Sequence, residues 1–373
     1  MSSYNRICKS SAIVAAASIC AFANAQWSFS GGADAYVGWA SPYEGSGATR
    51  VGRQFDSRNN ELRLANLQEY IHYADAKHGF SAQLTPFLGD NSDILNTTDS
   101  TRNQFDHHLA EAYLTEAWKN YSVDFGKWYS FIGGEAADSW ANDIYSRSLV
   151  YTFLQPAYHS GVRLNDNYSS VWGASLYATQ GWNQIVRKTS GESYGGQIRY
   201  NPSAKTAITV EGLFGKEGSN DPADTNNTGA TYGGFAMPFP AALFVSEADA
   251  VVTETVSDKV TVMANGTYGN AGTADKWVGG ELVGHYKFNP KWQVAARGEL
   301  LNDNHGIRFG SGIGGPSVSA ESASLEADYS VDASTTIRTE LRSDFANRSV
   351  FPSTSGLSKK EQTTLNVNLT IKF

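Results

Sequence analysis

The chain has almost no cysteine: its 373 residues contain two, Cys8 and Cys20, and both lie within the first 25 residues. The remainder therefore offers no thiol for disulfides, metal ligation or nucleophilic chemistry. After residue 25 it also lacks an apolar run of about 18 residues, which excludes membrane-spanning helices. A basic tract is missing too, and together with a net charge of −8 this argues against nucleic-acid binding.

Catalytic and metal-binding signatures are also absent from the sequence. The seven histidines are scattered, and no Gly-x-Ser-x-Gly or comparable motif accompanies them, so we expect no catalytic residues and no enzyme activity. His107 and His108 are adjacent in an expected strand and therefore point to opposite faces, which is a poor arrangement for holding one metal ion. The sequence predicts neither a cofactor nor a metal site.

The start of the chain has the features of a secretory signal peptide. A short basic segment precedes an apolar stretch at 12–22, and a small-x-small cleavage site follows. We predict that residues 1–25 are removed, which takes away Arg6 and Lys9 and no acidic residue and so changes the net charge from −8 to −10. No linker rich in Pro, Gly or Ser divides 26–373, so we expect a single domain there.

The last twelve residues, 362–373, alternate with a period of two. Such alternation is typical of a β-strand, and about 16 segments of this kind follow one another from Gln26 onward. A soluble β-sandwich would turn the apolar face toward a core, whereas a membrane barrel would turn it toward lipid, and the strand alone leaves both open. Its apolar face consists of Leu365, Val367, Leu369, Ile371 and Phe373.

The lengths of the connections favour the barrel. Short turns built from Asn, Asp, Pro, Ser and Lys occupy every second connection, and longer loops lie between them. This alternation predicts an all-β, transmembrane, antiparallel up-and-down β-barrel of about 16 strands with short periplasmic turns and long external loops. The longer loops are expected at 40–61, 89–106, 132–156, 180–192, 215–241, 269–276, 302–321 and 346–361.

Aromatic residues gather near the predicted turns, as expected where a barrel meets the membrane interface. The C-terminal Phe373 resembles the terminal aromatic that barrel-insertion machinery recognises, so we expect it to act as an assembly signal. The residues near the turns are Trp118, Tyr121, Tyr168, Tyr200, Phe288, Trp292 and Tyr329.

The third long loop, 132–156, combines apolar and charged residues. A 16-stranded barrel encloses a lumen too wide to select solutes, so we hypothesise that this loop folds inward and narrows it. Opposed charges on loop and wall would then focus an electric field across the pore. The alternative is a solvated external loop. The candidate constriction residues are Glu135, Asp138, Asp143 and Arg147 in the loop and Arg163, Arg199, Arg297, Arg338 and Arg342 in the wall.

Around this loop the chain resembles a known family. The resemblance rests on Phe125-Gly126-Lys127 with Gly133-Gly134-Glu135, on Asn-Asp-Ile-Tyr-Ser-Arg-Ser-Leu at 142–149, and on Gln-Pro-Ala-Tyr-His-Ser-Gly-Val-Arg at 155–163. These segments are similar to the OmpL-like β-barrel porin family. Elsewhere the chain agrees with that family only in its pattern of short alternating strands. The resemblance implies a porin-type channel of a Gram-negative outer membrane, without catalytic residues.

Two classes of function remain open. The first is an outer-membrane porin, a water-filled channel for passive diffusion of small hydrophilic solutes with a mildly acidic lumen that favours cations, or a saccharide-selective variant. The second is a structural or adhesive barrel with little conductance. The expected partners are outer-membrane lipid and lipopolysaccharide, the barrel-assembly machinery and copies of the chain in a homotrimer. The candidate trimer wall contains Gly266, Gly279, Gly280 and Gly284.

Overall fold

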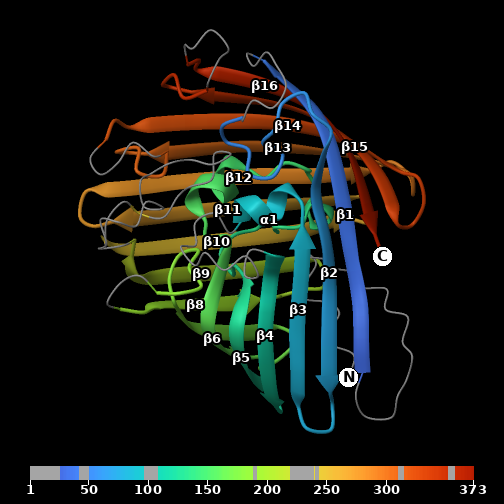
Figure 1. Cartoon of the computed structure of the whole chain (residues 1–373), viewed down its shortest axis with the longest axis vertical. Helices are drawn as coiled ribbons and strands as arrows, with labels where there is room; N and C mark the ends of the chain where they lie inside the picture. The colour runs from blue at the N-terminus through green and yellow to red at the C-terminus, as the bar shows by residue number, and fades with distance from the viewer. Residues whose placement is uncertain are drawn as a thin grey trace.

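The computed structural model describes residues 26–41, 50–95, 108–187, 191–218, 239, 243–309, 315–351 and 358–373, so the predicted signal peptide lies outside the described residues. The described strands form a closed antiparallel barrel (Figure 1). They are β1 Gln26–Ser41, β2 Arg63–Asp75, β3 Phe80–Leu88, β4 Leu109–Trp118, β5 Tyr121–Tyr129, β6 Tyr158–Asp166, β7 Trp172–Thr179, β8 Ser193–Tyr200, β9 Thr206–Glu217, β10 Leu243–Ser257, β11 Val260–Ala271, β12 Asp275–Lys287, β13 Trp292–Asp303, β14 Val318–Ser330, β15 Thr335–Ala346 and β16 Glu361–Lys372.

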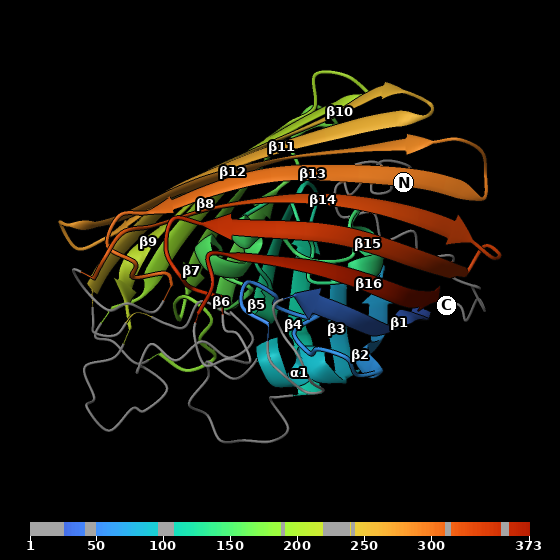
Figure 2. The same ribbon diagram turned by 90° about the horizontal axis from the view of Figure 1, so that it is seen from above.

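Each strand pairs with its neighbours in sequence, and β1 closes the ring by pairing with β16 from Gly32↔Lys372 to Ser41↔Thr363. Figure 2 shows β16 lying between β15 and β1. The predicted fold class, an all-β antiparallel up-and-down barrel of sixteen strands, is therefore confirmed. The alternating C-terminal segment is β16, as the sequence indicated.

The two faces of the strands divide as the alternation predicts. On β13, Leu300 is 63% exposed, whereas Arg297 and Glu299 on the opposite face are buried. The same division recurs on β16, where Leu369 is exposed and Asn368 is buried. Apolar side chains thus cover the outside and polar side chains point inward, which is the arrangement of a barrel that meets lipid.

The connections follow the predicted alternation with one exception. The loop expected at 269–276 is a turn of residues 272–274, because β11 and β12 extend further than the pattern suggested. Gly272 in this turn has a φ of 63°, a conformation that glycine adopts without steric cost. Parts of the expected loops at 40–61, 89–106, 180–192, 215–241, 302–321 and 346–361 lie outside the described residues.

Short helical segments accompany the loops: α1 Asp90–Leu95, η2 Ser139–Ala141 and η3 Val150–Leu154. No helix in the described part of the chain is long and apolar enough to cross a membrane. α1 packs against β2, β3 and β4, and η3 packs against β11, β12 and β13.

The largest apolar cluster lies inside the barrel. Inward-facing Leu213, Trp277 and Leu301 belong to the same buried cluster as Phe153 and Leu154 of the third loop. Burial of such side chains contributes on the order of 2 kcal/mol each. Part of the lumen is therefore a packed core, which holds the loop to the wall of β9–β14.

Candidate pore constriction

The segment between β5 and β6 crosses the interior of the barrel. Soon after leaving β5, the Gly133 amide donates to Glu211 Oε2 on β9 at 2.8 Å. Further along, the Ser139 hydroxyl donates to Asp34 Oδ2 on β1 at 2.6 Å. Near its end, Gln155 Nε2 donates to Asn265 Oδ1 on β11 at 2.9 Å. Contacts on strands so far apart in the ring mean that the segment spans the lumen.

Three wall arginines bind the backbone carbonyls of this loop. Arg297 Nη1 donates to the Ser146 carbonyl at 2.7 Å, and Arg342 Nη1 donates to the Arg147 carbonyl at 2.7 Å. Arg338 Nη1 donates to the Ser139 carbonyl at 2.8 Å. All three guanidinium groups are buried, so they anchor the loop and do not face open water.

Carboxylates of the same wall hold the loop amides. Glu326 Oε2 accepts from the Tyr145 amide at 2.8 Å, and Glu340 Oε2 accepts from the Ser146 amide at 3.1 Å. Glu299 accepts from the amide of Leu149. Strands β13–β15 therefore provide donors for the carbonyls and acceptors for the amides of a loop backbone that has no strand partner. Buried backbone N–H and C=O groups need such hydrogen-bond partners.

The predicted acids of the loop differ in their surroundings. Glu135 pairs with Arg297 at 2.7 Å, and its side chain is 4% exposed. Asp138 is buried and accepts a hydrogen bond from the Tyr70 hydroxyl on β2. Asp143 pairs with His285 Nδ1 on β12 at 2.8 Å and stays 32% exposed. Asp143 is thus the member of this set that remains in contact with water.

Arg147 braces the loop from within. Its guanidinium donates to the carbonyls of Ala136, at 3.1 Å, and of Tyr145, at 2.6 Å, and also to that of Ala137. It lies 4.7 Å from the ring of Phe55, a favourable position for a cation. Its role in the structure is to fix the shape of the loop.

Two of the predicted wall arginines do not contact the loop acids. Arg163 on β6 pairs with Asp124 at 2.6 Å, and Arg199 on β8 donates to Asn167 at 2.6 Å. Both point inward, but their partners lie on β5 and in the turn after β6 and not on the third loop. The structure therefore brings together Arg297, Arg338 and Arg342 with the loop and leaves these two apart.

Protonation of Asp138 gives the loop a pH dependence. Burial raises the pKa of this carboxyl to about 7; Arg147 opposes the rise and Asp34 adds to it. A raised pKa means that the neutral form stabilises the folded state, so the stabilisation is full below the usual pKa near 4 and is lost as pH rises through about 7.

We therefore expect the urea midpoint of the protein in detergent micelles to fall as pH increases from about 5 to about 8. Asp138→Asn should reduce that dependence, because the amide does not titrate, while other buried carboxyls, among them those of Glu211 and Glu217, also titrate and keep the remainder. Asp258→Asn, in the exposed turn between β10 and β11, serves as the matched control and should leave the slope unchanged. An equal slope in wild type and Asp138→Asn would contradict the prediction.

Sequence reasoning missed a second inward segment. Residues 50–60 of the first loop also lie inside, where Arg50 Nη1 donates to Asn366 Oδ1 on β16 at 2.8 Å. Arg53 lies 3.6 Å from Asp344 on β15. Phe55 packs 6.3 Å from the ring of Tyr151 in the third loop. The sequence did contain a signal for this inward position, because residues 50–60 mix charged and apolar residues as the third loop does.

An aromatic box at the external side was also missed. Arg308, in the loop after β13, lies 4.7 Å from the Trp182 ring, 4.8 Å from Phe239 and 5.4 Å from Trp277. Its Nε donates to the Phe153 carbonyl at 2.7 Å. Arg308 and the three rings thus connect the loops after β7, β9 and β13 and the strand β12 to the end of the third loop.

Among the described residues, no group of three or more His, Cys, Asp or Glu is placed to hold a metal ion; His107 lies outside them.

The fold and the loop together define a class: a sixteen-stranded membrane barrel with a segment fixed across its lumen. The chain belongs to the family described as "Putative beta-barrel porin-2, OmpL-like", whose model matches residues 26–373. The predicted family is confirmed, and fold and family are those of a channel rather than of an enzyme.

Solved structures of outer-membrane channels share the fold. An anion-selective porin from Comamonas acidovorans matches with a TM-score of 0.62 at 9% identity, covering 94% of this chain and 100% of that one. The outer-membrane channel DcaP of Acinetobacter baumannii matches with a TM-score of 0.61 at 11% identity, covering 95% and 99%. The trimer form of OmpT of Vibrio cholerae matches with a TM-score of 0.57 at 11% identity, covering 94% and 100%. A comparison with curated protein sequences gave no match.

Proposed function

We propose that the protein is an outer-membrane porin whose water-filled channel passes small hydrophilic solutes by passive diffusion and is narrowed by the loop 132–156. The observation that carries the proposal is the set of hydrogen bonds between loop residues 145–149 and the wall of β13–β15. A loop held at its backbone by buried ionic groups stays in the lumen, so solutes pass through the space beside it.

In this proposal the charged residues have two roles. Arg297, Arg338 and Arg342 act as anchors that position the loop, together with Glu135 of the loop itself. Asp143 acts on the solutes, because it is the predicted acid that stays in contact with water. A carboxylate at a narrow point attracts cations, so we expect a weak preference for cations.

Planar-bilayer recording tests the function. The purified protein should give stable ohmic steps, and a KCl gradient across the bilayer should give a reversal potential of the sign expected for weak cation preference. Liposome swelling with sugars of graded size then measures the size limit. A barrel that inserts and gives no steps would exclude the porin proposal, and saturable swelling with one sugar would favour a saccharide-selective channel.

The family and the barrel fold point to an outer-membrane location. There the proposed partners are lipid and lipopolysaccharide around the apolar outer face, and the barrel-assembly machinery, for which Phe373 is the proposed recognition signal. Phe373 is exposed, and its carbonyl accepts from the Gly31 amide at 2.8 Å, so its ring is displayed at the end of the barrel. A homotrimer is the proposed assembly, as in the trimer form of OmpT.

A structural barrel with little conductance is the second candidate. The observation in its favour is the amount of protein inside: the segment 50–60, helix α1 and the third loop all contribute to buried clusters. Such an interior would suit a protein that braces the envelope or displays loops. The bilayer recording separates the two candidates, since the structural barrel would leave the membrane insulating.

A further inference from the structure

The inner wall of the barrel continues on the periplasmic side of the third loop. Gln197 on β8 donates to the Phe131 carbonyl at 3.3 Å, and His285 on β12 pairs with Asp143 at 2.8 Å. In a strand that rises about 3.3 Å per residue and is tilted by about 45°, the next inward residue lies roughly 5 Å nearer the periplasm. We call the inward residues between such contacts and the turns the periplasmic inner rim.

Two cations of the periplasmic inner rim are Arg199 and Lys287. Arg199 follows Gln197 by two residues and Lys287 follows His285 by two, so each shares the inward face of its strand. Tyr286, next to Lys287 in the chain, points outward and is exposed. Lys287 itself is exposed and Arg199 is half-buried, so both cations reach water.

Lys372 is the third cation of the inner rim. It pairs with Gly32 on β1, and a Cβ added to Gly32 would lie 2.9 Å from the Trp140 ring of the third loop. This row therefore faces inward, and Lys372 is exposed. The carboxylate of the C-terminal Phe373 offsets part of its charge, so Arg199 and Lys287 are the stronger contributors.

The charge of the inner rim is positive on balance. Among the described residues, none of its three cations has an ion-pair partner on a side chain. The acids of the inner rim do have cations: Asp124 lies 2.6 Å from Arg163, and Asp328 lies 3.2 Å from Arg338. Arg338 also pairs with Glu326, so that trio carries at most one negative charge. Positive charge therefore exceeds negative charge on this part of the wall.

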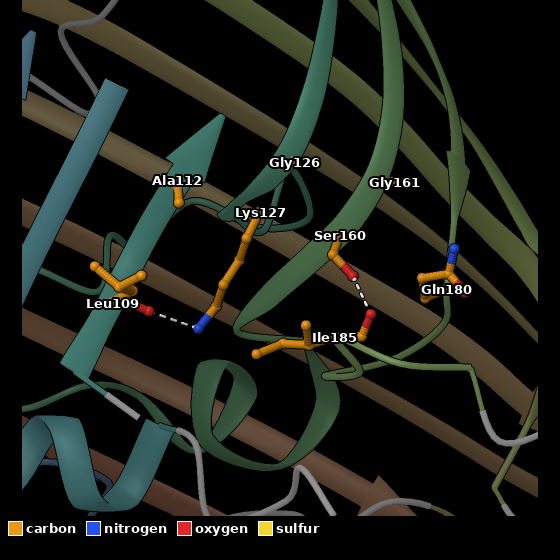
Figure 3. A pocket seen from close by; sticks show the side chains of 8 residues that line it. All are labelled: Leu109, Ala112, Gly126, Lys127, Ser160, Gly161, Gln180 and Ile185. Atoms are coloured by element: carbon orange, nitrogen blue, oxygen red, sulfur yellow. Dashed lines mark hydrogen bonds between the residues drawn. The ribbon is translucent and has the colours of Figure 1, made fainter. Parts of the chain in front are cut away.

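Two other lysines of the wall and turns do not add to this charge. Lys127 is buried and lies in a separate crevice of about 310 Å³ lined by residues of β4, β5 and β6, where its Nζ donates to the Leu109 carbonyl at 2.7 Å (Figure 3). Lys291, in the turn after β12, lies 5.9 Å from the ring of Tyr329, which itself is 4.9 Å from the ring of the exposed Trp292. The amine of Lys291 is therefore on the outer side, which makes this residue a matched control for Lys287.

The three inner-rim cations are spread around the ring. They lie on β8, β12 and β16, which are four strands apart, so the positive charge extends over half of the wall and is not one patch. Asp143, the predicted loop acid that stays in contact with water, lies on the external side of Lys287, roughly 5 Å away along the axis. Negative charge at the narrow point is thus followed by positive charge on the periplasmic side.

We propose that this separation of charge along the axis makes the channel rectify, with Arg199, Lys287 and Lys372 attracting anions on the periplasmic side and the larger current flowing when the external side is positive. The inference rests on the proposed porin function and adds a direction to it. With the external side positive, cations enter past Asp143 and anions enter past the inner rim, so both accumulate in the pore. With the opposite sign both are drawn out, and the pore is depleted of ions.

Current–voltage curves of single channels in planar bilayers test the proposal. In about 0.1 M KCl on both sides the Debye length is about 10 Å, longer than the axial distance between Asp143 and the inner rim, whereas in about 1 M KCl it is about 3 Å. We expect the currents at about 100 mV of either sign to differ by roughly 1.5-fold or more at the lower salt concentration and to be nearly equal at the higher one.

Charge variants assign the effect to the inner rim. Lys287→Gln combined with Arg199→Gln should remove most of the difference between the two currents, and the barrel should still fold because both side chains reach water. Lys291→Gln removes a lysine at the same end of the barrel on the outer side and should keep the difference. Equal effects of the inner and outer variants would overturn the proposal.

Thiol chemistry fixes the orientation of the channel, since the chain after residue 25 has no native cysteine. Lys287→Cys is treated during recording with a methanethiosulfonate reagent that carries either a trimethylammonium or a sulfonate group. The chamber from which the reagent reacts faster is the periplasmic one. The ammonium reagent should restore the wild-type asymmetry, and the sulfonate reagent should reduce or reverse it. Identical effects of the two reagents would show that size and not charge is responsible, which contradicts the proposal.

The recordings separate this inference from the proposed porin function. Current steps of equal size at both signs of voltage in about 0.1 M KCl would refute the charge separation and leave the porin function intact. A larger current with the external side negative would also refute it, because the sign would be wrong. A barrel that inserts and gives no steps would refute the porin function itself.

Discussion

Replacing residues 135–145 with a short Gly-Ser linker is expected to raise the single-channel conductance roughly twofold or more, because this stretch crosses the lumen and its removal widens the space left for water and ions. The replaced stretch carries the Glu135–Arg297 pair, the η2 turn and the contacts to β1 and β2. The strand ladders do not involve it, so the barrel should remain closed. Planar-bilayer recording of purified protein measures the change.

The control for this variant is the same linker in place of 202–205, the exposed turn between β8 and β9. That replacement should leave the conductance at the wild-type value. Both variants are first shown to be folded by their resistance to unfolding in detergent. A folded 135–145 variant with unchanged conductance would show that the loop does not limit the current.

Arg297→Met is expected to destabilise the folded protein by about 3–5 kcal/mol, the usual cost of breaking a buried ion pair from one side. Arg297 lies 2.7 Å from Glu135 and 3.4 Å from Glu299, and all three side chains are almost completely buried. Removing the guanidinium leaves two buried carboxylates without this cation and frees the Ser146 carbonyl. The urea midpoint in micelles measures the loss.

Two further variants make this measurement specific. Arg199→Met removes an inward arginine of the same barrel that donates a hydrogen bond to the neutral Asn167, so we expect a loss of about 1 kcal/mol or less. Combining Arg297→Met with Glu135→Gln should recover part of the stability, since one unpaired carboxylate is then neutral. Equal losses for Arg297→Met and Arg199→Met would contradict an anchoring role for Arg297.

The fold was predictable because its signal is local. A period of two in segments such as Leu365 to Phe373 requires neighbours two residues apart, and turns such as Lys119-Asn120 are recognisable from their own residues. Which face is apolar follows from the same pattern. No long-range information is needed to arrive at a barrel with sixteen strands.

The site was predictable only in part, because its contacts join residues far apart in the chain. The sequence indicated that Glu135 would meet wall arginines, yet Arg297, its partner, is 162 residues away. Arg163 and Arg199 have the same inward alternation as Arg297. The difference is set by the path of the loop and by the shear of the barrel, which no local pattern encodes.

Arg308 illustrates the other limit. The aromatic rings around it come from the loop after β7, from Phe239 and from β12. In the sequence each of them looks like an ordinary aromatic residue. The segment 50–60 was overlooked for a similar reason, since its partners Asn366 and Asp344 follow about 300 residues later. The partners of such residues are found only once the strands are placed.

The position of Ser139 has a consequence for the order of assembly. Its hydroxyl binds Asp34 on β1 and its carbonyl accepts from Arg338 on β15, the two strands that flank β16. The third loop therefore links β1 and β15 from inside the barrel, across the place where β16 closes the ring onto β1. These two contacts join residues 105 and 199 positions apart. Because β1 and β15 are brought to either side of β16 only when the ring closes, we expect Ser139 to bind both strands only at that last step of folding.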